Sequence, residues 1–165
     1  LAVFHSSSAG ATENSADVWG GSVPYLVSVQ SPEDESQVTN YVSDVTVSFE
    51  EFESTVKENC PEAVLPEDKN AWITDIVYTD SGRIDTLNVG GVTIKGTQLR
   101  SMFSLRSTAV TIQVGDSGIT FTSTGYGHGV GMSQYGANTM AQEGSGYRDI
   151  LTWYYTGVGF ANLEE

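Results

Sequence analysis

The sequence predicts an α+β fold: a β-rich single domain with antiparallel sheet and a few helices, two of them near the C-terminus. Short alternating apolar segments are joined by turn signals at Gly90-Gly91 and at residues 115–118, a pattern typical of hairpins. Helix-start signals at Ser48 and Ser133 come before segments of helical composition. The 165 residues contain no internal repeat and no linker, and this length is enough for one core.

The N-terminal part is predicted to alternate between strand and loop. Leu1 to His5 is predicted as a short strand, and the serine- and glycine-rich Ser6 to Ser22 as a long polar loop. Tyr25 to Gln30 and Val42 to Val47 are predicted as strands. Because the chain starts inside a strand, with neither a methionine nor a signal sequence, we expect it to lack an N-terminal segment.

The middle of the chain is predicted to form one capped helix and a series of hairpins. Ser48 and Glu51 fit a capping box, which predicts a helix over Phe49 to Asn59 that Pro61 ends. An acidic loop over Glu62 to Asn70 follows. A strand is predicted over Trp72 to Thr79, with Trp72, Thr74, Ile76 and Tyr78 on one face. A helix is predicted from a Thr97 cap to Leu105. The other predicted strands are Arg83 to Val89, Val92 to Lys95, Ala109 to Val114 and Ile119 to Thr124.

The C-terminal part is predicted to hold two helices. The first runs from Ser133 to Glu143 and ends at Gly144, and the second covers Tyr147 to Tyr155.

Composition narrows the classes of partner. Twenty-one acidic and seven basic residues set the net charge at −14, which argues against nucleic acid and anionic membrane surfaces. No apolar run approaches the roughly 18 residues that a membrane span needs. With Cys60 as its one cysteine, the chain cannot form an internal disulfide.

The most unusual stretch, Gly125 to Ala137, contains five glycines. Glycine permits positive φ angles and close approach of other groups to the backbone. The polar residues of this stretch come where a helical pattern begins, and a helix N-terminus offers free N–H groups to a ligand.

The chain's two histidines, His5 and His128, occur in its two densest motifs, where they could orient a substrate hydroxyl, carry a proton or bind a metal. The alternative for each is a hydrogen bond to backbone.

The residues around these motifs suit a carbohydrate ligand, because a sugar offers an apolar face for stacking and a rim of hydroxyls. The stacking candidates are Trp19, Tyr25, Tyr126 and Tyr135, and the rim candidates are Asn14, Ser133 and Gln134. Core packing is the alternative for Trp19 and Tyr25. Arg106 and Ser107 are candidates for contacting a substrate carboxylate, which a guanidinium fork fits well. Pairing with an acidic neighbour is the alternative for Arg106 and for Arg100.

Three blocks of the sequence carry a family resemblance. The first block comprises Phe4 to Gly10, Thr12-Glu13-Asn14, Val18-Trp19-Gly20 and Pro24-Tyr25-Leu26. The second block comprises Leu99-Arg100 and Leu105 to Thr108. The third block comprises Gly125 to Ala137, Met140-Ala141, Gly144, Tyr147, Ile150-Leu151 and Tyr154 to Gly157. Together they resemble the stage II sporulation protein D (SpoIID) family, which includes the amidase-enhancer proteins. Glu33 to Asp75 matches weakly, and Ala9 stands where the family usually has glycine.

The resemblance implies a peptidoglycan lytic transglycosylase that acts outside the cytoplasm, in sporulation or wall remodelling. Such an enzyme cleaves MurNAc–GlcNAc bonds of peptide-stripped glycan strands and leaves 1,6-anhydro-MurNAc ends. The family's catalytic glutamate lies upstream of the block around His5. The resemblance therefore implies that residues 1–165 carry the substrate groove without this acid. Glu13 is the catalytic candidate inside the chain, with orientation of its loop as the alternative role.

The implied partners are peptidoglycan glycan strands, with other cell-wall or engulfment proteins as further candidates and no nucleic acid. The substrate-binding candidates are His5, Ser6, Ser8, Thr12, Glu13, Asn14, Trp19, Tyr25, Arg106, Ser107, His128, Ser133, Gln134 and Tyr135. We expect no metal or cofactor; zinc is the alternative, because some family members look to be zinc-binding, although no cysteine is near either histidine. Two other functions stay open: a non-catalytic glycan-binding or amidase-enhancer module, and a structural domain of a wall or spore-assembly complex.

Overall fold

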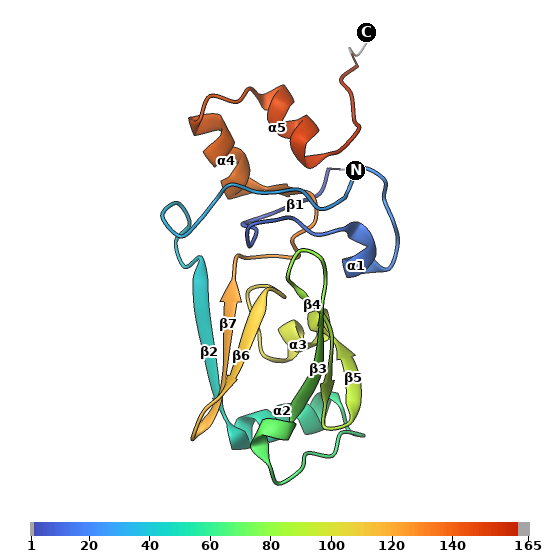
Figure 1. Ribbon diagram of the computed structural model, residues 1–165, viewed down its shortest axis with the longest axis vertical. Helices are drawn as coiled ribbons and strands as arrows, with labels where there is room; N and C mark the ends of the chain where they lie inside the picture. The colour runs from blue at the N-terminus through green and yellow to red at the C-terminus, as the bar shows by residue number, and fades with distance from the viewer. Residues whose placement is uncertain (1, 162–165) are drawn as a thin grey trace. The chain divides into compact units, whose positions relative to one another are not determined.

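Figure 1 shows the computed structural model, which describes residues 2–161. Helices and antiparallel sheets together give the α+β class that the sequence predicts. The described residues group into two compact units: one holds the residues up to Thr39 and those from Gly127 onward, and the other is Asn40–Tyr126. The extent of a single domain over 1–165 stays a prediction.

The second unit, Asn40–Tyr126, contains two three-stranded antiparallel sheets (Figure 1). The strands of one sheet lie in the order β2 (Val42–Ser48), β7 (Gly118–Thr124) and β6 (Val110–Val114). Those of the other lie in the order β3 (Ile73–Tyr78), β4 (Ile84–Val89) and β5 (Val92–Lys95). The hairpin between β4 and β5 turns at Gly90 and Gly91, whose φ angles of 56° and 87° suit a tight two-residue turn. The predicted hairpins are thus confirmed.

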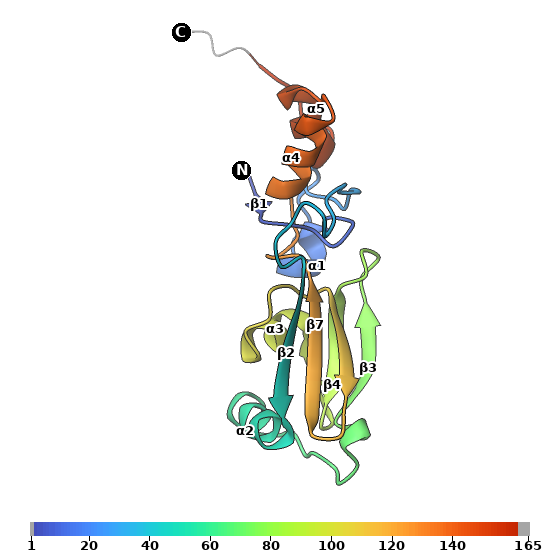
Figure 2. The same ribbon diagram turned by 90° about the vertical axis from the view of Figure 1, so that its left-hand side faces the viewer.

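Helix α2 (Phe49–Asn59) has the predicted bounds and follows β2 directly (Figure 2). The Ser48 Oγ accepts a hydrogen bond from the Glu51 N–H at 3.1 Å, and the Glu51 carboxylate accepts one from the Ser48 N–H at 2.8 Å. This reciprocal pair is the predicted capping box. Phe52 and Val56 are buried, so α2 contributes directly to the core of this unit.

Stacked aromatic rings lie at the centre of that core. The ring centroids of Phe52 and Trp72 are 5.3 Å apart, those of Phe52 and Phe103 5.2 Å, and those of Phe103 and Phe121 4.8 Å. Each such pair adds about 0.5–1.5 kcal/mol beyond the burial of area. These contacts join α2, β7 and the end of α3 (Gly96–Met102) into one apolar cluster.

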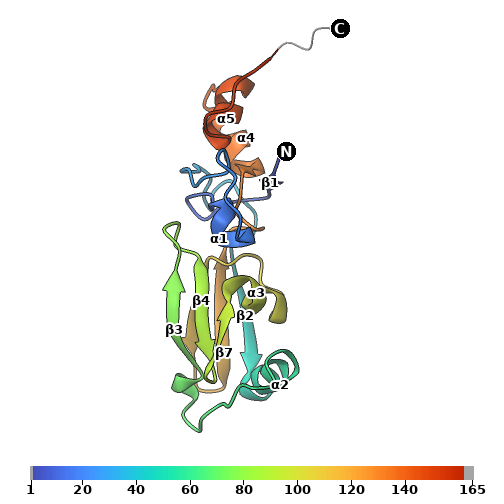
Figure 3. The same cartoon turned by 90° about the vertical axis from the view of Figure 1, so that its right-hand side faces the viewer.

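Two predicted details of this unit are wrong. Trp72, Thr74, Ile76 and Tyr78 do not share a face, because the pairing of β3 with β4 shifts after Thr74 and Asp75 has a positive φ of 50°. Lys95, not Thr97, precedes α3 as its N-cap, and the helix ends at Met102. A Cβ on Gly96 would lie 2.0 Å from the Ile84 carbonyl oxygen, so glycine starts this helix where it lies against β4 (Figure 3).

The first unit contains a short parallel pair of strands and three helices within the described residues. In chain order these are β1 (Phe4–His5), α1 (Ser15–Trp19), β8 (Met132–Ser133), α4 (Gln134–Gln142) and α5 (Tyr147–Tyr154). Ser133 caps α4, since its Oγ accepts from the Gly136 N–H at 3.1 Å, and both predicted C-terminal helices are present. The predicted first strand also included Leu1, which lies outside the described residues.

Two other predictions for this unit are wrong. The loop predicted over Ser6 to Ser22 contains the helix α1, which ends at a left-handed Gly20. The segment predicted as a strand over Tyr25 to Gln30 forms only an isolated bridge at Gln30. Its hydrogen bonds go partly to side chains: the Val29 N–H donates to the Thr12 hydroxyl at 2.9 Å, while the Val29 carbonyl accepts from the Thr12 N–H at 2.8 Å. Among residues 2–161 no helix is long and apolar enough to cross a membrane.

Candidate functional site

The peptide groups of Val130 orient both histidines in the first unit. The Nδ1 of His5 lies 3.1 Å from the Val130 carbonyl oxygen, and the Val130 N–H donates to the Nδ1 of His128 at 3.0 Å. A carbonyl oxygen only accepts and an N–H only donates, so the two neutral rings have opposite tautomers: His5 is protonated on Nδ1 and His128 on Nε2. One buried residue therefore determines which nitrogen of each imidazole carries the proton.

The His5 ring is locked on its other side by Ser8. The Nε2 of His5 and the Oγ of Ser8 are 2.7 Å apart, and in the neutral ring with its proton on Nδ1 the serine hydroxyl is the donor. His5 is 4% exposed and Ser8 is fully buried. This pair has the hydrogen bonds of a serine–histidine nucleophile, but the serine is closed to a ligand, so the pair fits a positioning role.

An exposed indole completes this cluster. The His128 ring centroid lies 5.7 Å from that of His5 and 5.4 Å from that of Trp19. Trp19 is 51% exposed, whereas His128 is half-buried. The cluster therefore runs from a buried imidazole through a half-buried one to an exposed aromatic face.

The glycines of the 125–137 stretch make this packing possible. A Cβ on Gly127, whose φ is 120°, would lie 2.8 Å from the Cβ of His5. A Cβ on Gly131 would lie 2.2 Å from the Val3 carbonyl oxygen. Both distances are too short for real atoms, so the stretch needs glycine where its backbone passes β1.

Glu33 is a buried carboxylate that the sequence analysis missed. It is 2% exposed and accepts hydrogen bonds from the Ser8 N–H and the Ser31 hydroxyl, each at 2.5 Å, and from the Ser133 hydroxyl. The Ser31 hydroxyl also lies 2.6 Å from the hydroxyl of Tyr154. This network joins the His5 loop to the start of α4 and to α5. Its sequence context, an acidic run in the weakly matching region, contains no signal that separates Glu33 from its exposed neighbours.

Burial raises the pKa of Tyr154 to about 12; the Ser31 hydrogen bond lowers it in part, and the nearby charge of Glu33 raises it. Gly136 lies against the same network. A Cβ there would be 2.1 Å from the Tyr154 hydroxyl and 2.3 Å from the Ser31 Oγ. A helix interior normally favours alanine over glycine, so this glycine has a packing reason.

The predicted candidates Thr12, Glu13 and Asn14 hold the loop together. Thr12 and Glu13 are buried, and the Glu13 carboxylate accepts from the Asn14 N–H at 3.0 Å. The Asn14 amide oxygen accepts from the Ser28 N–H at 2.9 Å, and its nitrogen donates to Asp17 at 2.9 Å. Loop orientation as the role of Glu13 stays a prediction.

The other candidates in this unit differ in exposure. Gln134 is exposed, while Ser6, Tyr25 and Tyr135 are half-buried. The Ser6 carbonyl accepts from the Tyr135 N–H at 3.1 Å, and the Tyr25 ring contacts Tyr155 edge to face at 6.3 Å. Ser133 is buried and is engaged as the α4 cap and by Glu33.

The last two candidates belong to the second unit. The Ser107 hydroxyl is turned inward, where it donates to the Thr124 carbonyl at 2.7 Å. The Arg106 guanidinium lies over the Tyr126 ring, 4.2 Å from its centroid. Pairing of Arg106 or Arg100 with an acidic neighbour was the alternative, but neither forms an ion pair within the described part of the chain.

Comparison with known proteins decides the family. No protein-family model matches the chain. Stage II sporulation protein D of Bacillus amyloliquefaciens is 36% identical over 163 residues, which cover 99% of this chain and 45% of that protein. The protein of the same name from Bacillus subtilis (strain 168) is 36% identical over 163 residues, which cover 99% of this chain and 46% of that protein. The chain belongs to the stage II sporulation protein D family.

This SpoIID-family chain spans about half the length of the curated relatives it matches. The protein named amidase enhancer from Bacillus subtilis (strain 168) is 27% identical over 208 residues, covering 95% of this chain and 29% of that protein. The first and third family-like blocks meet at the Val130 peptide groups in the first unit, and the second block lies in and after α3.

Imidazole nitrogens commonly bind metal ions, and the histidine cluster contains two imidazole rings. Among residues 2–161, no three His, Cys, Asp or Glu side chains are grouped so that they could hold a metal ion. The expectation that this SpoIID-family chain uses no cofactor stays a prediction.

Proposed function

We propose that this chain is the glycan-binding part of a peptidoglycan lytic transglycosylase that acts outside the cytoplasm during sporulation or wall remodelling. The observation that carries the proposal is the half-exposed Trp19 indole, which is in contact with the His128 ring at a centroid distance of 5.4 Å. A sugar ring can stack its apolar face on such an indole. The names of the relatives, stage II sporulation protein D and amidase enhancer, support a role at the cell wall in sporulation.

The proposed reaction needs one carboxyl group. It protonates the glycosidic oxygen as the bond to the anomeric carbon breaks, and its carboxylate then takes the proton of the muramic C6 hydroxyl. That hydroxyl oxygen bonds to the anomeric carbon, which closes the 1,6-anhydro ring without water. Glu13 and Glu33 are 1% and 2% exposed and are engaged in hydrogen bonds within the fold. Their burial supports an acid supplied by a part of the protein outside this chain.

The test compares this chain with a version extended upstream. Each is incubated with amidase-treated glycan strands, and the products are analysed by mass spectrometry for anhydromuramyl ends. We expect ends from the extended protein, and binding without new ends from this chain. If the unextended chain also produced anhydromuramyl ends, the catalytic acid would lie within residues 1–165, with Glu13 as the first candidate. Ends from neither protein would overturn the transglycosylase proposal.

The contribution of the indole is tested by binding. Trp19→Ala should weaken the affinity for glycan strands roughly 3- to 10-fold, as expected for the loss of one aromatic stack. Trp153→Ala is the matched control, because Trp153 is 47% exposed in the same unit but lies on α5. Equal affinities for wild type and both variants would contradict a sugar-stacking role for Trp19.

A second candidate function is a glycan-binding module without catalysis, which the relative named amidase enhancer favours. It predicts Trp19-dependent binding by both the chain and the extended protein, with no anhydromuramyl ends from either.

A further inference from the structure

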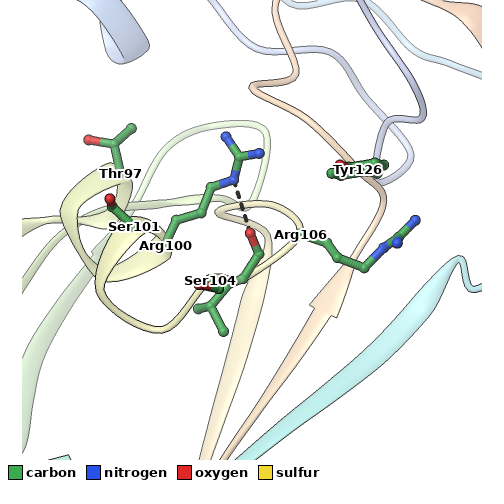
Figure 4. A pocket seen from close by; sticks show the side chains of 7 residues that line it. Thr97, Arg100, Ser101, Ser104, Arg106 and Tyr126 are labelled. Atoms are coloured by element: carbon green, nitrogen blue, oxygen red, sulfur yellow. Dashed lines mark hydrogen bonds between the residues drawn. The ribbon is translucent and has the colours of Figure 1, made fainter. Parts of the chain in front are cut away.

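A pocket of about 380 Å³ lies within the second unit, beside α3 (Figure 4). Its lining includes Arg100, Arg106 and Tyr126, together with the hydroxyls of Thr97, Ser101 and Ser104. The volume is in the range of small-molecule sites, and polar groups line much of it. None of the functional roles derived above uses this pocket as a whole.

The pocket concentrates positive charge in an acidic protein. The chain has seven basic residues against 21 acidic ones, and two of the seven line this pocket. The ion pair found in the described part of the chain joins Lys95 and Asp85, so neither pocket arginine has a carboxylate partner there. Both arginine side chains are half-buried. Two guanidinium groups without a carboxylate partner in one pocket fit an anionic ligand.

Neutral groups hold both guanidinium groups in place. The Arg100 Nε donates to the Leu105 carbonyl oxygen at 3.2 Å (Figure 4). The Arg106 guanidinium carbon lies 4.2 Å from the centroid of the Tyr126 ring. These contacts fix the side chains without neutralising them, so the pocket is arranged for a ligand before the ligand arrives.

Two further observations describe how the protein surrounds these guanidinium groups. The Arg106 Nε is buried and has no hydrogen-bond partner. Burial lowers the pKa of Arg100, an effect that Tyr126 partly offsets. A buried N–H without a partner is unfavourable, and an anion bound in the pocket would favour the charged form of Arg100.

We propose that this pocket binds the carboxylate of an acidic sugar unit, with Arg100 and Arg106 as the carboxylate ligands. This proposal rests on the proposed glycan-binding function and names the part of the glycan that is read. Guanidinium forks match the two oxygens of a carboxylate, and the three hydroxyl side chains suit the rim of a sugar. The site distinguishes a free carboxylate from an esterified or amidated one, which carries no charge.

The experiment uses isothermal titration calorimetry on this chain with three tetrasaccharides. The first alternates GlcNAc with MurNAc that carries a free lactyl carboxylate, the second is its methyl ester, and the third is neutral chitotetraose. We expect wild type to bind the free acid at least tenfold more tightly than the ester. This preference should shrink as salt is raised from about 50 to 500 mM, because the guanidinium–carboxylate attraction is screened.

Substitutions locate the effect. Arg100→Gln and Arg106→Gln should each reduce the preference for the free acid about tenfold, and Arg106→Lys should retain part of it because lysine keeps the charge without the fork. Arg148→Gln is the matched control: it removes the same charge from an arginine that also lies on aromatic rings, 5.2 Å from the Phe160 centroid, but in the other unit. Circular dichroism and thermal unfolding check that each variant is folded.

The outcomes separate this proposal from the function on which it rests. Equal affinities for acid, ester and chitotetraose, with Trp19 still required, would overturn the carboxylate site and leave glycan binding intact. A preference that survives in the folded double variant Arg100→Gln/Arg106→Gln would overturn its location. Binding of none of the three saccharides would overturn both proposals.

Discussion

Val130 shows how much of the candidate site depends on single peptide groups. Its carbonyl orients the buried His5 and its N–H orients the half-buried His128, so the site contains two imidazoles with opposite tautomers. Because both contacts are to backbone, substitution of the valine side chain leaves the hydrogen bonds available. Gly127 and Gly131 cannot be replaced in the same way, since a Cβ at either position would lie too close to His5 or Val3.

At Gly136 the expected effect of substitution is opposite to helix propensity. Alanine is favoured over glycine by about 0.5–1 kcal/mol in a helix interior, but here its Cβ would overlap the Tyr154 hydroxyl and the Ser31 Oγ. We expect Gly136→Ala to lower the free energy of unfolding by about 1–3 kcal/mol, measured by urea denaturation. Gly21→Ala is the control, because nothing lies within 4 Å of its added Cβ. A stabilised Gly136→Ala would contradict the observed packing.

Tyr154 gives the protein an alkaline sensitivity. Its pKa is raised from 10.0 to about 12 in the folded state, so the folded form keeps this proton when the unfolded form loses it. The corresponding stability is fully present below pH 10 and decreases as pH rises from about 10 to 12. Denaturation at several pH values should show this decrease, and Tyr154→Phe should make it shallower. An unchanged slope in the variant would mean that Tyr154 titrates normally.

At the scale of elements, the structure agrees with the sequence at several boundaries that a local signal sets. Helix α2 begins at its capping box, the β4–β5 hairpin turns at two glycines, and α4 begins after Ser133. Agreement fails where hydrogen bonds come from distant parts of the chain. Residues 25–30 have a strand-like sequence, but the N–H groups of Ser28 and Val29 donate to the side chains of Asn14 and Thr12.

The capping box of α2 can be measured directly. Ser48→Ala removes the acceptor for the Glu51 N–H and should lower the free energy of unfolding by about 1 kcal/mol. Ser54→Ala provides the matched control, since this exposed serine is inside α2, where alanine is the better helix former. The prediction fails if both variants have the stability of the wild type in urea denaturation.

At the scale of the whole molecule, the two units differ in their apolar cores. The second unit has a large buried cluster that includes Phe52, Trp72 and Phe121, whereas the buried apolar cluster of the first contains Leu26, Val130 and Tyr155. Polar networks such as that of Glu33 supply much of the first unit's interior. The first unit should therefore open locally at lower free energy than the second.

Hydrogen exchange followed by mass spectrometry tests this difference. Amides of β4 and β7 should exchange at least about tenfold more slowly than those of α4, corresponding to roughly 1.4 kcal/mol in opening free energy. Equal protection throughout residues 2–161 would mean that the two units open as one.

The sequence by itself determined the α+β class, most strands and helices of Asn40–Tyr126, and the motifs that carry the family resemblance. Caps, hairpin turns and glycine runs act over a few neighbouring residues, so they can be read directly from the chain. Tertiary structure alone decided that Glu33 is buried beside Ser8, that Ser107 turns inward, and that Arg100 and Arg106 have no acidic partner in the described chain. These outcomes depend on residues that are up to about a hundred positions apart, as Glu33 and Ser133 are. A local sequence pattern does not specify which of many similar side chains will be buried when distant segments pack together.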